Sequence, residues 1–139
     1  MDPLQMYRDE VKTLSSKALS EIGVSEPSFD VEVPSTEIAD FAVPCFPFAK
    51  ALKKSPMIIA SEAAEKISTS ELISKVWAEN GYLNFQINSG KLANTTLREI
   101  FSTGSDYGKG QKKADKPLLE HPSVNPTGPI HIGRARNPI

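Results

Sequence analysis

The dipeptide Asn80-Gly81 restricts the fold more than any other feature of this sequence, because it separates two stretches in which apolar and polar residues alternate. Asn-Gly is the preferred pair for a two-residue type I′ turn, in which both residues have a positive φ. The pattern predicts a β-hairpin with strands at 72–79 and 82–87. A two-residue loop also fixes the register. The expected pairs are Glu79 with Tyr82, Ala78 with Leu83, Trp77 with Asn84, Val76 with Phe85 and Lys75 with Gln86.

This register gives the hairpin two different faces. The apolar face, expected to enter the core, consists of Val76, Ala78, Leu83, Phe85 and Ile87. The mixed face consists of Lys75, Trp77, Glu79, Tyr82, Asn84 and Gln86. Tyr82 and Asn84 are two residues apart, roughly 7 Å on one face, so one can stack on a base while the other binds its edge. The residues alone leave open the alternative that Trp77 and Tyr82 simply pack on each other across the strands.

Patterns on either side of the hairpin predict further helices and strands. Apolar residues three and four apart from Leu4 to Ile22 indicate an amphipathic helix that ends at Gly23. The other expected elements are short strands at 29–33 and 40–43, a helical segment at 45–53, a helix starting at Ser55-Pro56 and a last helix after Asn88. Along one side of that last helix stand Leu92, Ala93, Leu97, Ile100 and Phe101. The predicted fold class is α+β, in two layers with the order α-β-β-α-β-β-α.

Composition indicates a small soluble globular protein. The chain has 139 residues, of which 39% are hydrophobic and 24% charged, which fits one compact domain with a tail. No apolar run of membrane-spanning length and no signal-peptide start is visible, so we expect no membrane association. A single cysteine, Cys45, rules out an internal disulfide and favours a cytoplasmic location. With two histidines, the sequence offers no structural metal site.

Charge is distributed unevenly along the chain. Residues 1–102 contain ten basic and fourteen acidic residues, whereas residues 103–139 contain six basic and three acidic ones. An acidic body does not bind a polyphosphate through bulk charge, so any contact with nucleic acid there must be local and depend on shape. Residues 103–116 are rich in glycine and lysine and read as a linker.

The segment 123–136 carries the clearest chemical pattern. A strand runs into a turn with Gly128 and then into a helix start that bears His131 and Gly133. Backbone N–H groups at a helix start favour anions, and a glycine leaves room for a base or ribose. These features suit a nucleotide, while the Pro- and Gly-rich composition by itself favours a disordered terminus.

The run from Asn125 to Gly133 resembles the signature around the His-Ile-Gly-His motif of class I aminoacyl-tRNA synthetases. The form Ser-x-Asn-Pro-Thr-Gly-Pro, preceded by Glu120, resembles the arginyl-tRNA synthetases. Three further segments resemble sequence landmarks of that family: Gly81-Tyr82-Leu83-Asn84-Phe85, Asp40-Phe41-Ala42 and Tyr107-Gly108. The resemblance therefore covers essentially the whole chain.

The resemblance implies a domain organisation and a reaction. Residues 1–102 correspond to the family's N-terminal additional domain, which binds the D-loop at the tRNA elbow, and 117–139 to the truncated start of a Rossmann-like catalytic domain. The parent protein, expected to be monomeric, would be an arginine-tRNA ligase that uses ATP with Mg2+ to join L-arginine to tRNA-Arg. The fragment alone is predicted to be inactive, because a doubly wound domain needs several βαβ units.

The same resemblance assigns residues to sites. The catalytic residues would be His131 and Arg134, and ATP would be bound by Gly128, His131, Gly133 and Arg134. Arginine would be bound by Glu120, Ser123 and Asn125, and tRNA by Tyr82, Asn84 and Trp77. Arg134 stands where the family has its second motif histidine.

Two other functions remain open from the sequence. One is a stand-alone RNA-binding module without catalysis, and the other is a glutamyl-type synthetase of the same superfamily.

Overall fold

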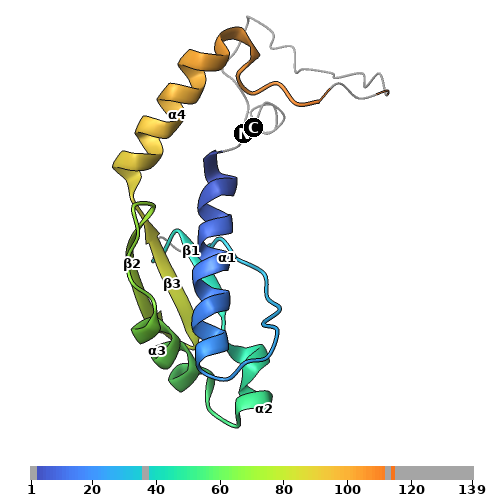
Figure 1. The fold of residues 1–139 in the computed structure, drawn as a ribbon, viewed down its shortest axis with the longest axis vertical. Helices are drawn as coiled ribbons and strands as arrows, with labels where there is room; N and C mark the ends of the chain where they lie inside the picture. Colours follow the sequence, from blue (N-terminus) through green and yellow to red (C-terminus); the bar gives the residue numbers. More distant parts are fainter. Residues whose placement is uncertain (1–2, 36–37, 112–113, 115–139) are drawn as a thin grey trace, which may run out of the picture. The chain divides into compact units, whose positions relative to one another are not determined.

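A three-stranded antiparallel sheet with helices on one face forms the body of the protein (Figure 1). The structure is a computed structural model and describes residues 3–35, 38–111 and 114. The strand order is β1-β3-β2, with β1 at Phe41–Pro44, β2 at Ile73–Glu79 and β3 at Tyr82–Ile87. The chain divides into two units, 1–107 and 108–139, and all of these elements belong to the first. The predicted α+β class is confirmed, while the Rossmann-like fragment lies outside the described residues.

The hairpin forms in the predicted register. All five expected pairs are present, from Lys75 with Gln86 to Glu79 with Tyr82. Asn80 and Gly81 have φ values of 54° and 80°, as a type I′ turn requires. The ladder is irregular between Ile73 and Lys75, where β2 begins one residue later than expected.

The strand predicted at 29–33 is wrong. This segment makes an isolated bridge between Glu32 and Ala42, with N···O distances of 2.8 and 2.9 Å. Pro34 has no N–H to continue the ladder, so pairing ends at the bridge. Val31 is buried, whereas Val33 is 63% exposed, so the alternate residues of this segment do not all face the core. The sheet consequently has three strands instead of four.

The helices begin and end near the expected residues. α1 spans Pro3–Glu21, and Gly23 follows it with a φ of 104°. The helical segment after β1 consists of a 3-10 turn, η1 (Phe46–Phe48), and the short α2 (Ala49–Leu52). α3 spans Pro56–Lys66, and the Ser55 hydroxyl caps it by accepting the N–H of Ile58 at 3.4 Å.

The last helix, α4 (Ser89–Thr103), is capped by Asn88, whose side chain accepts the N–H of Lys91 at 3.1 Å. A short 3-10 turn, η2 (Gly104–Asp106), follows it. The apolar side of α4 is largely exposed to solvent, since Leu97 is 53% and Phe101 82% exposed. The amphipathic pattern therefore predicts the helix correctly, although most of its apolar side is not buried.

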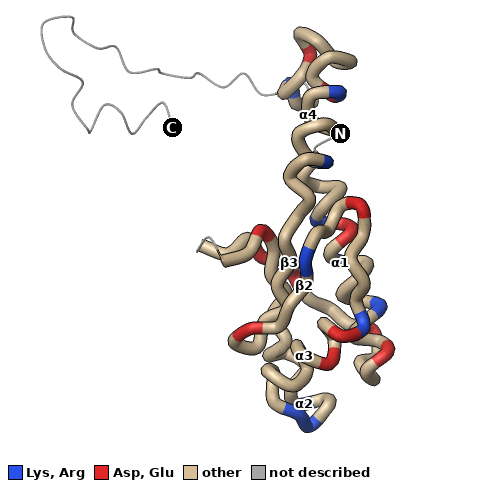
Figure 2. Tube along the Cα trace, turned by 90° about the vertical axis from the view of Figure 1, so that its left-hand side faces the viewer, with Lys and Arg blue, Asp and Glu red and all other residues tan. Residues whose placement is uncertain are grey.

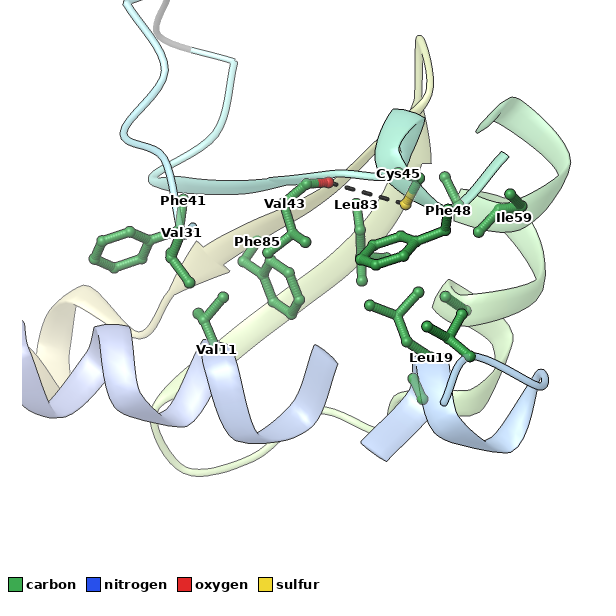
Figure 3. Packing of buried hydrophobic residues seen from close by; sticks show 14 of the residues in the cluster. Val11, Leu19, Val31, Phe41, Val43, Cys45, Phe48, Ile59, Leu83 and Phe85 are labelled. Atoms are coloured by element: carbon green, nitrogen blue, oxygen red, sulfur yellow. Dashed lines mark hydrogen bonds between the residues drawn. The ribbon is translucent and has the colours of Figure 1, made fainter. Parts of the chain in front are cut away.

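The core lies between the sheet and the two helices α1 and α3 (Figure 3). Alternate residues of β3, Leu83 and Phe85, are fully buried and face the helices. β1 contributes Val43 and Phe41 to the same face, because they pair with these two residues. α1 contributes Val11 and Leu19, and α3 contributes Ile59, Ala60 and Ala63. Among the described residues, no helix packs on the opposite face of the sheet.

Gly81 is the residue at which the turn leaves least room. A Cβ added there would lie 2.9 Å from Phe46 Cζ and 3.1 Å from Pro56 Cβ. We expect Gly81→Ala to lower the free energy of unfolding by about 2–4 kcal/mol, since left-handed strain and overpacking add. Urea denaturation of the 139-residue chain measures this.

Gly108→Ala is the matched control, because its φ of 76° is similar and nothing lies within 4 Å of its added Cβ. That variant carries backbone strain alone and is expected to lose about 1 kcal/mol or less. Equal losses in the two variants would contradict the steric argument.

The buried thiol of Cys45 makes stability depend on pH in the basic range. Burial is the main cause that raises its pKa from 9.0 to about 11. Unfolded chains lose this proton at lower pH than folded ones, so the free energy of unfolding is unaffected below pH 9 and falls as pH rises to about 11. The expected fall is about 3 kcal/mol. Denaturation at a series of pH values measures it.

Cys45→Ala is expected to be less stable than the unaltered chain below pH 9, where the thiol is protonated in both states, and to lack this part of the fall at higher pH. Burial also raises the pKa of Tyr7, which remains in the variant and contributes a residual slope of the same sign. An unchanged slope in Cys45→Ala would show that the thiol is not its source.

Candidate nucleic-acid interface

A groove of about 440 Å³ lies on the helix-free face of the sheet, between the hairpin and the segment that precedes β1. Its volume falls in the range of pockets that hold small molecules or single groups of larger ones. Its lining consists of Glu32, Val33, Pro34, Ser35, Ile38, Ala42, Glu79, Asn80, Tyr82 and Asn84. Two of the three residues predicted to bind RNA, Tyr82 and Asn84, are therefore brought together in one concave site.

Strand pairing explains why these residues share the groove. Asn84 lies on the central strand, paired with Ala42 on one side and with Trp77 on the other. Tyr82 pairs with Glu79. Because side chains alternate along a strand, these groups point away from the face that Leu83 occupies in the core. The division into an apolar and a mixed face is confirmed.

The wall of the groove opposite the hairpin is held by two contacts to the segment before β1. The bridge between Glu32 and Ala42 ties this segment to the edge of the sheet. Arg8 of α1 donates a hydrogen bond of 2.6 Å to the carbonyl of Val31, and its guanidinium lies 5.6 Å from the ring centre of Phe41. The wall is therefore anchored from both layers of the domain.

Asn84 is nearly buried, with 6% of its surface exposed. Its Nδ2 donates to the carbonyl of Tyr82 at 3.4 Å, which is longer than an ordinary hydrogen bond. A bond of that length is weak, so the amide can exchange it for a ligand at small cost. Asn84 is thus placed at the base of the groove with hydrogen-bonding capacity to offer.

Tyr82 is half-buried, and its ring meets the edge of the Phe46 ring, with centres 5.3 Å apart and planes at 72°. Trp77 has different partners. Its Nε1 donates to Glu79 at 3.2 Å, and the Lys75 ammonium lies 5.0 Å from its ring centre. The alternative in which Trp77 and Tyr82 pack on each other is therefore not the arrangement found in the described part of the chain. Trp77 lies beside Asn84, outside the groove lining.

The groove carries acidic and neutral groups. Glu32 and Glu79 contribute carboxylates, and no lysine or arginine occurs among the described lining residues. Such a surface favours a neutral group with hydrogen-bond donors over a phosphate. Basic residues occur elsewhere in the chain, such as Lys50, Lys53 and Lys54 in and just after α2, where the tube in Figure 2 is blue.

The remaining predicted site residues lie outside the described residues: Glu120, Ser123, Asn125, Gly128, His131, Gly133 and Arg134. Their roles stay predictions. Among residues 3–35, 38–111 and 114, no three His, Cys, Asp or Glu side chains gather as a metal ion would need. No helix in the same part of the chain is both long and apolar enough to cross a membrane.

Sequence reasoning missed the wall of the groove and Phe46. The wall includes Glu32 and Ile38, which are distant from the hairpin in sequence and carry no motif. Phe46 carried no signal in the sequence either, because the burial of Gly81 against its ring is visible only in the structure.

Comparison with known proteins identifies the family to which the chain belongs. Residues 9–87 match the arginyl tRNA synthetase N terminal domain family. The chain belongs to this family. It is 39% identical to an arginine--tRNA ligase of Methanocaldococcus jannaschii over 138 residues, which are 94% of this chain and 24% of that protein. An arginine--tRNA ligase of Campylobacter jejuni is 44% identical over 118 residues, 84% of this chain and 22% of that protein.

A solved structure agrees with this assignment. Thermus thermophilus arginyl-tRNA synthetase matches with a TM-score of 0.56 and 30% identity, over 94% of this chain and 21% of the other. The resemblance to arginyl-tRNA synthetases predicted from the sequence is confirmed. This member of the family spans less than a quarter of the length of these relatives.

Proposed function

We propose that this chain is the amino-terminal part of an arginine-tRNA ligase and that residues 1–102 bind tRNA-Arg at its elbow. The observation that carries the proposal is the groove in which Tyr82 and Asn84 lie together on the helix-free face of the sheet. The relatives are named arginine--tRNA ligases, which supports tRNA as the ligand. An unpaired base of the D-loop is the part of the tRNA that suits a groove of this kind.

The groove has the chemistry to take up a base. Single-stranded RNA is recognised by stacking of splayed bases on aromatic rings and by hydrogen bonds to their edges. Tyr82 offers a ring held at one side, and the Asn84 amide offers both a donor and an acceptor. The Glu32 and Glu79 carboxylates keep phosphates out of the groove. Trp77, which pairs with Asn84, would provide a ring for the flanking nucleotide, and Lys75 beside that ring would provide a cation.

The catalytic proposal concerns residues 117–139 within the longer parent protein. Glu120, Ser123 and Asn125 would bind L-arginine, with the carboxylate meeting the guanidinium or the amino group. Gly128, His131, Gly133 and Arg134 would bind ATP with Mg2+. The arginine carboxylate would attack the α-phosphate and release pyrophosphate, which gives arginyl-adenylate. A hydroxyl of the terminal ribose of tRNA-Arg would then attack the arginyl carbonyl to form the ester, and AMP would leave. His131 and Arg134 would donate hydrogen bonds to the phosphate oxygens as charge develops. We further propose a cytoplasmic, monomeric parent.

Substitutions in the groove test the binding role. Tyr82→Ala and Asn84→Ala are each expected to weaken binding of a tRNA-Arg transcript by about tenfold, because stacking on an aromatic ring contributes about 1–3 kcal/mol and a hydrogen bond to the base edge about 1 kcal/mol. Fluorescence anisotropy at one fixed salt concentration measures this with the 139-residue chain.

Matched controls lie outside the groove. Tyr107→Ala removes a tyrosine that is 41% exposed, and Gln86→Ala removes an exposed amide on the same strand and face as Asn84. Both controls are expected to bind like the unaltered chain, and circular dichroism checks that all four variants fold. If neither groove variant binds more weakly, the hairpin does not contact RNA.

Catalysis is expected only from the parent protein. The 139-residue chain is predicted to show no arginine-dependent exchange of pyrophosphate into ATP, whereas the parent is expected to show it and to lose it on His131→Ala. Exchange by the isolated chain would refute the assignment of 117–139 as an incomplete site, and a parent that fails to charge tRNA-Arg would refute the ligase proposal.

A further inference from the structure

Phe46 is an aromatic residue that is not part of the hydrophobic core. It is 48% exposed, although its neighbours Cys45 and Phe48 are 0% and 6% exposed. Phe48 packs in the core against Phe29, with ring centres 6.3 Å apart, whereas the Phe46 ring points to the hairpin turn. Leaving half of a phenylalanine ring in water forgoes part of the free energy that its burial would provide, so the contacts that it does make with the turn are worth examining.

The turn is shaped to receive this ring. The position that a Gly81 side chain would occupy is filled by Phe46, whose Cζ and Cε1 lie 2.9 and 3.2 Å from the added Cβ. The backbone is held at the same place, because the N–H of Cys45 donates to the Gly81 carbonyl at 3.0 Å. Phe46 is therefore fixed relative to the turn by backbone and by shape.

The same ring then meets Tyr82. The two rings make an edge contact with centres 5.3 Å apart and planes at 72°. Tyr82 lines the groove and Phe46 does not. Phe46 thus supports the tyrosine from outside the site, and the support limits the rotation of a side chain that would otherwise have to be ordered when a ligand binds.

We propose that Phe46 is a positioning residue, which holds the Tyr82 ring in the orientation that accepts an unpaired base. This inference rests on the proposed function of the groove. It assigns a binding contribution to a residue that does not touch the ligand, and it explains why an aromatic side chain stays exposed beside the turn.

A pair of substitutions at Phe46 tests the role of its ring. Phe46→Leu keeps an apolar side chain but removes the ring edge, and we expect it to weaken binding of the tRNA-Arg transcript about threefold to tenfold. Phe46→Tyr keeps the ring edge and is expected to bind within twofold of the unaltered chain. Phe101→Leu, at an 82% exposed phenylalanine on α4, is the matched control and is expected to have no effect.

Coupling to Tyr82 distinguishes positioning from a structural role. In a Tyr82→Ala background, Phe46→Leu is expected to cause no further loss, because the ring that it positions is gone. The free chain gives a second readout: the aromatic NMR signals of Tyr82 are expected to lose their ring-current shift in Phe46→Leu and to keep it in Phe46→Tyr.

Each outcome decides the inference. Unchanged binding by Phe46→Leu, or an equal loss with and without Tyr82, would overturn it, the latter because Phe46 would then contact RNA itself or act through stability. Unchanged binding by Tyr82→Ala alone would overturn the proposed function of the groove, and the inference with it. These failures are distinguishable, because the last is seen in a variant that retains Phe46.

Discussion

Two consecutive residues with positive φ, Asn80 and Gly81, hold β2 and β3 in one register, and the two faces of the sheet follow from that register. A slip of one residue would exchange the faces, placing Tyr82 and Asn84 in the core and Leu83 in solvent. Gly81 is also buried, since Phe46 fills the space beside it, whereas Asn80 is exposed. The geometry of the core and the geometry of the groove are therefore set at the same two residues.

The groove exists because the sheet has helices on one face and a short anchored segment on the other. α1 and α3 cover the apolar face, and after a single bridge at Glu32, residues 33–35 and Ile38 line the groove on the opposite face. Pro34 prevents a fourth strand from forming there. Had the ladder continued, the sheet would have been wider and flatter, and the wall that encloses Tyr82 would be absent. The segment that does not continue as a strand therefore forms part of the groove.

The RNA binding proposed for this acidic domain requires contributions from more than one part of the protein. Nonspecific affinity for nucleic acid comes from neutralised phosphates, which the groove with its two carboxylates does not provide. Base contacts in such a site supply selectivity, and the remaining affinity must come from basic residues elsewhere, such as those around α2, or from the rest of a longer protein. Membership in the arginyl-tRNA synthetase family agrees with that view, because the relatives are more than four times as long as the portion matched here.

The sequence by itself determined the features that depend on neighbouring residues. The Asn80-Gly81 turn set the hairpin register, Ser55-Pro56 set the start of α3, and the spacing from Leu4 to Ile22 set α1. The contacts between distant segments came from the tertiary structure: 29–33 pairs at one residue, Tyr82 meets Phe46 instead of Trp77, and Glu32 and Asn84 line the same groove. The physical reason is that local patterns report φ preferences and the side of an element that is apolar, whereas contacts between distant segments depend on which arrangement of all the elements fills the core with least strain.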